Sequence, residues 1–305
     1  MPKPPDTSTE IPAEDLEGFL VRHRLPEAFR DTATSFYLPL AARLPSFREG
    51  DETLLLGING AQGTGKSTLA DFLDIAAASL FGWRSAVLSI DDFYLTLAER
   101  RSLATSVHPL LETRGVPGTH DTGMLDTTLD GLVALATEER ARLPRFDKAS
   151  DDRAPEHEWP VVTGPIDMIV LEGWCVGSEA ETNDALAQPV NGLERDEDAD
   201  GNWRGYANEK LKSDYAPIFD RLDALVFLAA PSFEAVYRWR LEQEQKLASA
   251  SGGRGKGLMD ADGVARFIRF YERITRHNLA ALPKRADAVL TLDEEHAVTA
   301  CRYKS

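Results

Sequence analysis

The apolar residues of this chain follow two patterns, short continuous runs and longer stripes with an apolar residue at every third or fourth position. Continuous runs bounded by polar or turn residues predict buried strands, and they occupy residues 53–59, 85–90, 166–171, 224–230 and 288–292. Stripes predict amphipathic helices, and the clearest lie at residues 68–78, from 232 onward and at 260–282. Because strands that alternate with helices form parallel sheets covered on both faces, we predict a three-layer α/β fold around a mostly parallel five-stranded sheet.

The N-terminal part of the chain stands outside this alternation. Residues 1–12 are rich in Pro and Thr and are expected to be disordered. Residues 13–50 show helical spacing interrupted by Pro26 and Pro39, which predicts short helices packed on the part that follows. Residues 51–305 are then expected to form one domain.

Two segments within this domain have an unusual composition. Residues 178–202 carry eight acidic side chains and hardly any apolar ones in their second half, so we expect a solvated surface insertion there. Residues 238–260 contain the glycine-rich stretch 249–257 with Arg254 and Lys256. A helix that runs into a flexible, basic, glycine-rich stretch suits a lid that moves over a bound ligand.

The overall charge and composition narrow the classes of function. Lys and Arg number 34 against 50 Asp and Glu, which gives a net charge of −16. A duplex nucleic-acid binder needs a basic face, so this class is disfavoured, and an anionic substrate would require a local basic patch. No apolar run approaches the roughly 18 residues of a membrane span, the N-terminus lacks the apolar core of a secretory signal, and two cysteines make no disulfide framework. These features predict a cytoplasmic protein without a nucleic-acid or membrane partner, and they leave its oligomeric state open.

The strongest chemical signal is a glycine-rich loop between the first strand and the first long helix. It matches the P-loop pattern of two glycines followed by Lys and a hydroxyl residue, and it consists of Gly60, Ala61, Gln62, Gly63, Thr64, Gly65, Lys66 and Ser67, with Thr68 next in the helix. In such a loop backbone N–H groups surround phosphate oxygens, and the helix N-terminus adds positive potential. Lys66 would reach the β- and γ-phosphates of ATP, and Ser67 would supply an oxygen to Mg²⁺. The motif therefore predicts a P-loop NTPase-type fold that binds ATP and Mg²⁺.

Carboxylates follow two of the predicted strands. Asp91 and Asp92 end the second strand and Glu172 ends the third, and ligands of open α/β sheets bind at the carboxyl ends of strands. A carboxylate there could accept the proton of an attacking hydroxyl, and another could hold the metal beside the phosphate loop. The alternative for the first pair is structural, in which Asp92 caps the next turn while Phe93 and Tyr94 pack in the core.

Basic residues gather in the irregular loops between the second and third strands, namely Arg114, His120, Arg145 and Lys148. They predict a patch suited to a small anion such as a carboxylate, with charged surface decoration as the alternative. A nucleoside would instead need aromatic faces, of which these loops supply few. His108 and His157 lack such company and are expected at the surface.

The helix after the fourth strand carries a further candidate. Arg240 falls within its apolar stripe, whereas Arg238 points away from it. Arg240 either pairs with Glu244 one turn later or turns toward the phosphates of a bound nucleotide. The sequence leaves both alternatives open.

Six motifs occur in a fixed order along the chain: GAQGTGKS at 60–67, SIDDFYLT at 89–96, RGVPGTHD at 114–121, RFDK at 145–148, LEGW at 171–174 and YRWRLEQE at 237–244. Together they resemble the D-glycerate 3-kinase family, within the phosphoribulokinase, uridine kinase and pantothenate kinase group of P-loop kinases. The resemblance runs from about Tyr37 to the C-terminus. The acidic stretch 194–200 departs from the family pattern.

The resemblance implies roles for individual residues. Asp91 would be the general base, Glu172 the acid that organises magnesium, and Lys66 and Ser67 the P-loop pair. Arg240 is the candidate lid arginine beside the nucleotide. The positions associated with the acceptor would be Arg114, His120, Asp121 and Arg145, and we add Asp92 and Tyr94 as further candidates for the acceptor site.

We therefore predict an ATP-dependent kinase that transfers the γ-phosphate to a hydroxyl of a small anionic acceptor. The acceptor implied by the resemblance is D-glycerate, which would give 3-phosphoglycerate. Two alternatives remain open: a kinase of another metabolite such as uridine or pantothenate, and a P-loop ATPase without a small-molecule acceptor. A regulatory GTPase would need an Asn/Thr-Lys-x-Asp stretch after a strand, and the sequence contains none.

Overall fold

The structure, a computed structural model, describes residues 11–250 and 260–304. Most of the predicted disordered N-terminus and the glycine-rich part of the predicted lid, with Arg254 and Lys256, therefore lie outside the described residues. Across the part that is described, no helix is both long enough and apolar enough to cross a membrane.

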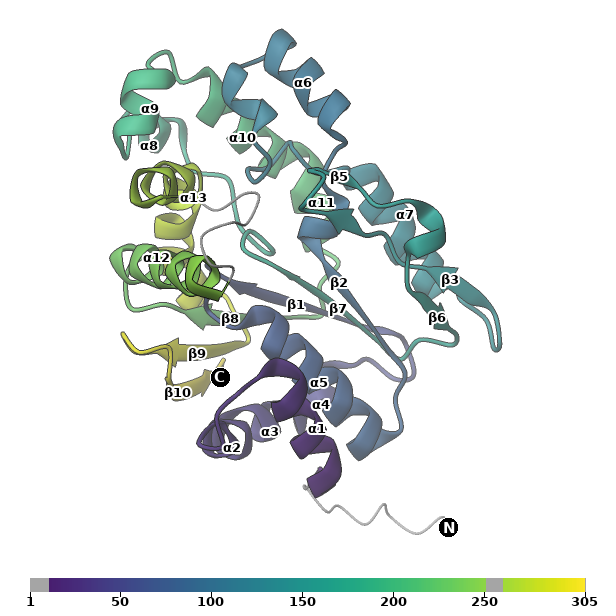
Figure 1. Ribbon diagram of the computed structural model, residues 1–305. Helices are drawn as coiled ribbons and strands as arrows, with labels where there is room; N and C mark the ends of the chain where they lie inside the picture. Colours follow the sequence, from purple (N-terminus) through teal and green to yellow (C-terminus); the bar gives the residue numbers. More distant parts are fainter. Residues whose placement is uncertain (1–10, 251–259, 305) are drawn as a thin grey trace, which may run out of the picture.

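A six-stranded sheet forms the centre of the molecule, with the strand order β10–β9–β8–β1–β7–β2 (Figure 1). Its strands are β1 (Leu54–Gly60), β2 (Ser85–Ser89), β7 (Met168–Gly173), β8 (Ala224–Ala229), β9 (Ala288–Leu292) and β10 (Val298–Tyr303). The five predicted strands are parallel to one another, whereas β10 runs antiparallel to β9 at the edge. The prediction of five strands was one short, because β10 is largely exposed beyond Val298 and has no continuous apolar run.

Helices cover both faces of the sheet, as predicted. One face packs against α1 (Ala13–His23), α3 (Leu38–Ala41), α4 (Leu44–Phe47), α5 (Lys66–Phe81) and α12 (Phe233–Ala250). The other face packs against α7 (Thr122–Val133), α10 (Asn202–Lys210), α11 (Ala216–Phe219) and α13 (Ala261–Ala281). Strand β1 contributes side chains to the hydrophobic cores on both faces of the sheet. Leu54 and Leu56 lie in the core that contains α5, and Leu55 lies in the core that contains α7.

The connections between these elements carry short helices and two small antiparallel ribbons. Their bounds are α2 (Phe29–Thr32), α6 (Leu97–Ser106), α8 (Asn183–Leu186), α9 (Gly192–Glu197), β3 (Arg140–Arg142), β4 (Phe146–Asp147), β5 (Asp152–Arg153) and β6 (Val161–Thr163). The ribbon β4–β5 matters most for function, because Phe146 N donates to Asp92 just beyond the end of β2. A loop far along the chain is thereby fixed at the carboxyl edge of the sheet.

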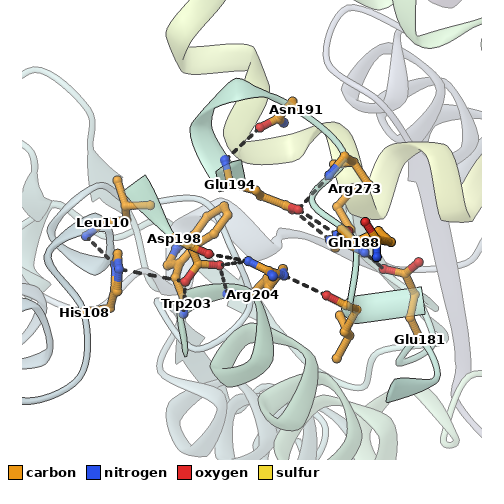
Figure 2. A network of polar contacts seen from close by, with 12 residues as sticks. His108, Leu110, Glu181, Gln188, Asn191, Glu194, Asp198, Trp203, Arg204 and Arg273 are labelled. Atoms are coloured by element: carbon orange, nitrogen blue, oxygen red, sulfur yellow. Dashed lines mark hydrogen bonds and ion pairs between the residues drawn. The ribbon is translucent and has the colours of Figure 1, made fainter. Parts of the chain in front are cut away.

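The acidic segment 178–202 is not solvated throughout, which corrects the expectation from its composition. Most of its acids are exposed, but Glu194 and Asp198 are buried, at 1% and 2% exposed. Figure 2 shows that each of these two acids faces an arginine. Arg273 of α13 donates to both Glu194 oxygens at 2.8 and 2.6 Å, and Arg204 of α10 donates to Asp198 at 2.8 Å. These arginines neutralise the buried acids, and the composition of the segment alone could not reveal them.

His108 is likewise not a surface residue, contrary to expectation. Its side chain is 15% exposed, and its Nε2 lies 3.9 Å from the carboxylate of Asp198 (Figure 2). Its Nδ1 accepts a hydrogen bond from Leu110 N at 3.2 Å and so caps a short 3₁₀ turn. His157 is exposed, as predicted.

Candidate functional site

A cleft lies at the carboxyl edge of the sheet, over the ends of β1, β2 and β7. Its cavity has a volume of about 500 Å³. The residues named from the sequence that line it are Gln62, Gly63, Lys66, Ser67, Asp91, Asp92, Tyr94, Arg114, Lys148, Glu172 and Arg240. The fold thus brings the phosphate loop, the strand-end carboxylates and three loop or helix cations into one place.

The glycine-rich loop closes over the start of α5. Gly63 and Gly65 have positive φ angles of 80° and 87°, a conformation that favours glycine. A Cβ on Gly60 would lie 2.5 Å from Thr64 Oγ1, so the first glycine of the motif lets the loop fold back on its strand. Thr64 Oγ1 in turn donates to Ala61 O at 2.9 Å. The predicted sequence of strand, loop and helix is confirmed, and the N-terminus of α5 faces the cleft with its N–H groups free of helix partners.

Lys66, Ser67 and Glu172 lie together at the floor of the cleft. Lys66 Nζ donates to Ala61 O at 3.1 Å, and burial lowers the pKa of Lys66 against the opposing effect of Glu172 and Asp91. Ser67 Oγ donates to Glu172 Oε1 at 2.8 Å. Mg²⁺ is usually held by one or two carboxylates together with substrate phosphates. A hydroxyl beside a carboxylate at the phosphate loop fits such an ion.

Asp91 follows β2 in a 3₁₀ turn and faces the cleft. Its Oδ1 accepts a hydrogen bond from Tyr94 OH at 3.0 Å, and its Oδ2 accepts one from Lys148 Nζ at 2.6 Å. Burial disfavours the charged form, but Lys148, with smaller contributions from His120 and Lys66, outweighs burial and lowers the pKa of Asp91. Asp91 is therefore an ionised carboxylate at neutral pH, and the Lys148 ammonium lies against its Oδ2.

Asp92 has a different environment from its neighbour. Its Oδ1 accepts from Phe146 N at 3.1 Å and its Oδ2 from Arg145 Nη1 at 3.1 Å. Burial raises the pKa of Asp92, and Arg145 opposes that rise. Phe93 and Tyr94 are buried in the core, as the structural alternative expected. Asp92 thus touches the cleft but mainly fixes the ribbon β4–β5.

His120, Asp121 and Arg145 are not among the residues that line the cleft. The His120 ring stacks on Tyr94 with centroids 4.4 Å apart, and its Nδ1 lies 2.7 Å from Tyr215 OH. Burial lowers the pKa of His120 to about 4, so its imidazole is neutral at neutral pH. Asp121 caps the N-terminus of α7, and Arg145 holds Asp92. His120 and Arg145 thus contact residues that line the cleft, namely Tyr94 and Asp92.

Arg240 makes the pair with Glu244 that one of its two alternatives predicts, whereas a contact with nucleotide phosphates stays a prediction. It lines the cleft and also pairs with Glu244 one turn later. Its guanidinium lies 5.3 Å from the centroid of the Phe267 ring. Arg238 points away from the cleft and pairs with Glu294, as its place on the helix predicted.

Aromatic residues form one wall of the cleft, and the sequence pattern does not predict this wall. Trp174, Phe267 and Tyr271 line the cavity together with Tyr94. Tyr271 packs edge-on against Trp174 with centroids 4.8 Å apart, and its hydroxyl donates to Arg114 O at 3.4 Å. Trp174 follows Glu172 by two residues, which was an available signal. Phe267 and Tyr271 belong to the apolar stripe of α13, where spacing does not distinguish a core face from a ligand face.

Comparison with known proteins gives relatives along most of the chain, although no family model matches it. A Schizosaccharomyces pombe protein named "Uncharacterized kinase mug58" is 37% identical over 226 residues, which cover 71% of this chain and 78% of that protein. The chloroplastic D-glycerate 3-kinase of Arabidopsis thaliana is 31% identical over 273 residues, or 84% of this chain and 56% of that protein. Among solved structures, the D-glycerate 3-kinase of Cryptococcus neoformans is similar with a TM-score of 0.72 at 26% identity, covering 92% of this chain and all of that one.

Proposed function

We propose that this chain, which belongs to the D-glycerate 3-kinase family of P-loop kinases, transfers the γ-phosphate of ATP to the 3-hydroxyl of D-glycerate. The observation that carries the proposal is the single cleft that joins the P-loop, Asp91 and Lys148. Phosphoryl transfer requires a phosphate cradle, a group that takes the hydroxyl proton and a means of holding the acceptor. The cleft supplies each of these from a different element.

The nucleotide would lie along the P-loop, with its γ-phosphate at Lys66 and its α-phosphate toward Thr68. Thr68 and Gly65 line a second cavity of about 430 Å³ on the other flank of the loop. The N-terminal helices contribute Phe29 and Tyr37 to that cavity, and the turn before β10 contributes His296 and its neighbours. An aromatic-lined hollow next to the α-phosphate end suits a nucleotide base.

The acceptor would lie across the cleft from the P-loop, where Lys148 and Arg114 offer positive charge. Arginine and lysine both form charge-assisted hydrogen bonds to carboxylates. An acceptor as small as D-glycerate could then place its carboxylate on these cations and its terminal hydroxyl near Asp91. This placement supports an anionic acceptor in a protein of net charge −16, because it provides the local basic patch.

The residues of the cleft suggest the following division of work. Asp91 accepts the proton of the attacking hydroxyl. Lys66 and Arg240 stabilise the charge on the equatorial oxygens of the transferred group. Ser67 and Glu172 would hold Mg²⁺, which neutralises charge on the phosphate oxygens when bound. The aromatic wall excludes water from the reacting atoms, so that ATP is not hydrolysed.

A second candidate is a nucleoside acceptor. The aromatic rings of Trp174, Phe267 and Tyr271 line the cavity, and such rings can stack on a base. The expectation that the acceptor side is poor in aromatic residues therefore holds for the loops between β2 and β7 and not for the whole cleft.

We further propose a cytoplasmic location, which the two free cysteines, Cys175 and Cys301, support.

The experiment that tests the proposed function compares kcat/KM for a panel of acceptors with the purified protein, ATP and Mg²⁺. The panel contains D-glycerate, L-glycerate, pantothenate, uridine and ribulose 5-phosphate, and the position of the phosphate is read by ³¹P NMR. We expect a clear preference for D-glycerate. A preference for uridine would establish the nucleoside candidate. Steady ADP release that no acceptor changes would instead identify a P-loop ATPase.

A further inference from the structure

Both oxygens of the Asp91 carboxylate carry hydrogen-bond donors. Tyr94 OH donates to Oδ1 at 3.0 Å, and the Lys148 ammonium donates to Oδ2 at 2.6 Å. A carboxylate held by an ammonium at this distance is a weaker base, because its protonation would leave the ammonium without a counter-charge. The base of the proposed reaction is therefore shielded, and a single side chain forms the shield.

We propose that Lys148 shields Asp91 until an anionic acceptor binds and draws the ammonium away, so that the general base becomes available only together with the substrate. The inference rests on the proposed kinase function and makes Lys148 a ligand of the acceptor's anionic group. Water carries no negative charge and leaves the shield in place. The same device that selects an anionic acceptor therefore protects ATP from hydrolysis.

The hairpin that carries Lys148 is anchored, whereas the Lys148 side chain is not. Asp147 accepts hydrogen bonds from the two backbone N–H groups that follow Lys148, at 2.9 and 3.2 Å. The buried Arg100 donates to Asp151 O at 2.8 Å on the other side of the tip. The Lys148 side chain itself is 59% exposed, and its flexible four-carbon stem can rotate in solvent. The ammonium can thus move without any movement of the backbone.

The other cations that line the cleft have partners of a different kind. Arg114 pairs with Asp151, and Arg240 pairs with a glutamate one turn later on the same helix. Lys66 donates to a carbonyl of the P-loop and lies where the phosphates bind. Among the cleft cations of the described residues, Lys148 is the one whose partner must itself be freed for the reaction.

The displacement fits a balanced reaction step. The acceptor carboxylate takes the Lys148 ammonium, and the acceptor hydroxyl takes its place at Asp91 Oδ2. The hydroxyl proton passes to Oδ2 while the hydroxyl oxygen forms a bond to the γ-phosphorus, and the bond from that phosphorus to the bridging oxygen breaks to release ADP. Tyr94 keeps its hydrogen bond to Oδ1 and orients the carboxylate throughout.

The test compares Lys148→Met with the charge-retaining variant Lys148→Arg and with Lys212→Met, an exposed lysine outside the cleft. ADP release is measured without acceptor, with D-glycerate and with glycerol, the neutral analogue that lacks the carboxylate. We expect Lys148→Met to raise acceptor-independent ADP release about tenfold, below the full contribution of a positioned base. The KM for D-glycerate should rise by about tenfold, as for a lost charged hydrogen bond, with the KM for ATP unchanged. The preference for D-glycerate over glycerol should shrink. Lys148→Arg, which keeps the positive charge, should raise the acceptor-independent rate less than Lys148→Met, and Lys212→Met should keep the wild-type rate.

A double variant tests whether the extra acceptor-independent ADP release of Lys148→Met depends on Asp91. In Asp91→Asn/Lys148→Met the extra ADP release should disappear, because the unshielded carboxylate is its source. An acceptor-independent rate in Lys148→Met equal to or below that of the wild type overturns the proposal, and so does a gain that persists in the double variant. A wild type that fails to phosphorylate D-glycerate refutes the proposed acceptor instead, and the comparison without acceptor still decides whether Lys148 shields Asp91.

Discussion

Two clusters in this protein combine basic and acidic side chains and differ in how fully those side chains are paired. In the network of Figure 2, Arg273 makes five hydrogen bonds, to Glu194 twice, to Glu181 once and to two backbone carbonyls. This number uses every N–H of the guanidinium. In the cleft, Lys66 reaches a backbone carbonyl at 3.1 Å, and Lys148 is paired but 59% exposed.

The difference indicates that the charges of the network stabilise the fold, whereas the charges of the cleft are arranged around a cavity. A buried ion pair with all its hydrogen bonds made is stable as long as neither partner is removed. Charges around an open cavity, with pKa values displaced by burial and by one another, are typical of functional sites. The cavity of about 20 Å³ beside Arg273 has room for little more than a water molecule, whereas the cleft measures about 500 Å³.

The largest effect on the side of the cleft is expected from Lys66→Met. The γ-phosphate would lose its fixed cation, and turnover should fall by about 10³-fold or more, the range for a cation that stabilises a transferred phosphoryl group. Steady-state kinetics and nucleotide titration measure the change, with thermal unfolding as the control for folding. Near-normal kcat in a folded variant would contradict the assignment of the P-loop as the phosphate site.

On the side of the network, Arg273→Met should destabilise the fold by about 3–5 kcal/mol, because it leaves the buried Glu194 without its partner. The matched control is Arg195→Met, since Arg195 pairs with Asp196 at the exposed surface and such pairs contribute about 0–1 kcal/mol. Urea unfolding measures both values. Equal free energies of unfolding for the two variants would mean that the network is no more structural than a surface pair.

A third prediction concerns His120, a buried and neutral group behind the cleft. Burial lowers its pKa from 6.5 to about 4, so between these pH values the unfolded state binds more protons than the folded state. Stability therefore falls as the pH drops from 6.5 to 4, and this residue accounts for roughly 3 kcal/mol of the loss. His120→Gln should remove that part of the slope, and His157→Gln, an exposed control, should not. Parallel pH profiles for wild type and His120→Gln would contradict the prediction.

The same comparison shows why the sequence predicts some features and not others. The P-loop and the parallel strands rest on contiguous residues, so their signals are local and were read correctly. The sequence does not predict the edge strand β10, because this strand has no continuous apolar run. Glu194 and Tyr271 depend on partners that lie far away in the chain, and Tyr271 has the same helical spacing whether it faces a core or a cavity.

For a related reason, the sequence alone does not show which of the two adjacent aspartates is better placed to act as the general base. Asp91 and Asp92 have the same side chain and differ in their contacts. Asp91 accepts hydrogen bonds from Tyr94 and Lys148, and Asp92 accepts them from Phe146 N and Arg145. His120, Asp121 and Arg145 belong to the same loops as Arg114 and Lys148 but do not line the cleft, and spacing alone contains no information about side-chain direction. The sequence therefore predicts which loops reach the cleft, but not which of their side chains line it.

The last prediction tests this ranking of the two carboxylates, and it is the smallest in free energy. Asp91→Asn should lower kcat by roughly 10²-fold, the lower range for a positioned general base, and leave the KM for ATP nearly unchanged. Asp92→Asn should have a smaller effect on kcat, because Asp92 acts on the ribbon β4–β5 through Phe146 N and Arg145. Both variants preserve side-chain volume, so a loss of activity reports charge and proton acceptance, and circular dichroism verifies that each is folded. If Asp92→Asn shows the large loss and Asp91→Asn does not, Asp92 is the general base and the contacts of Asp91 with Tyr94 and Lys148 belong to the fold.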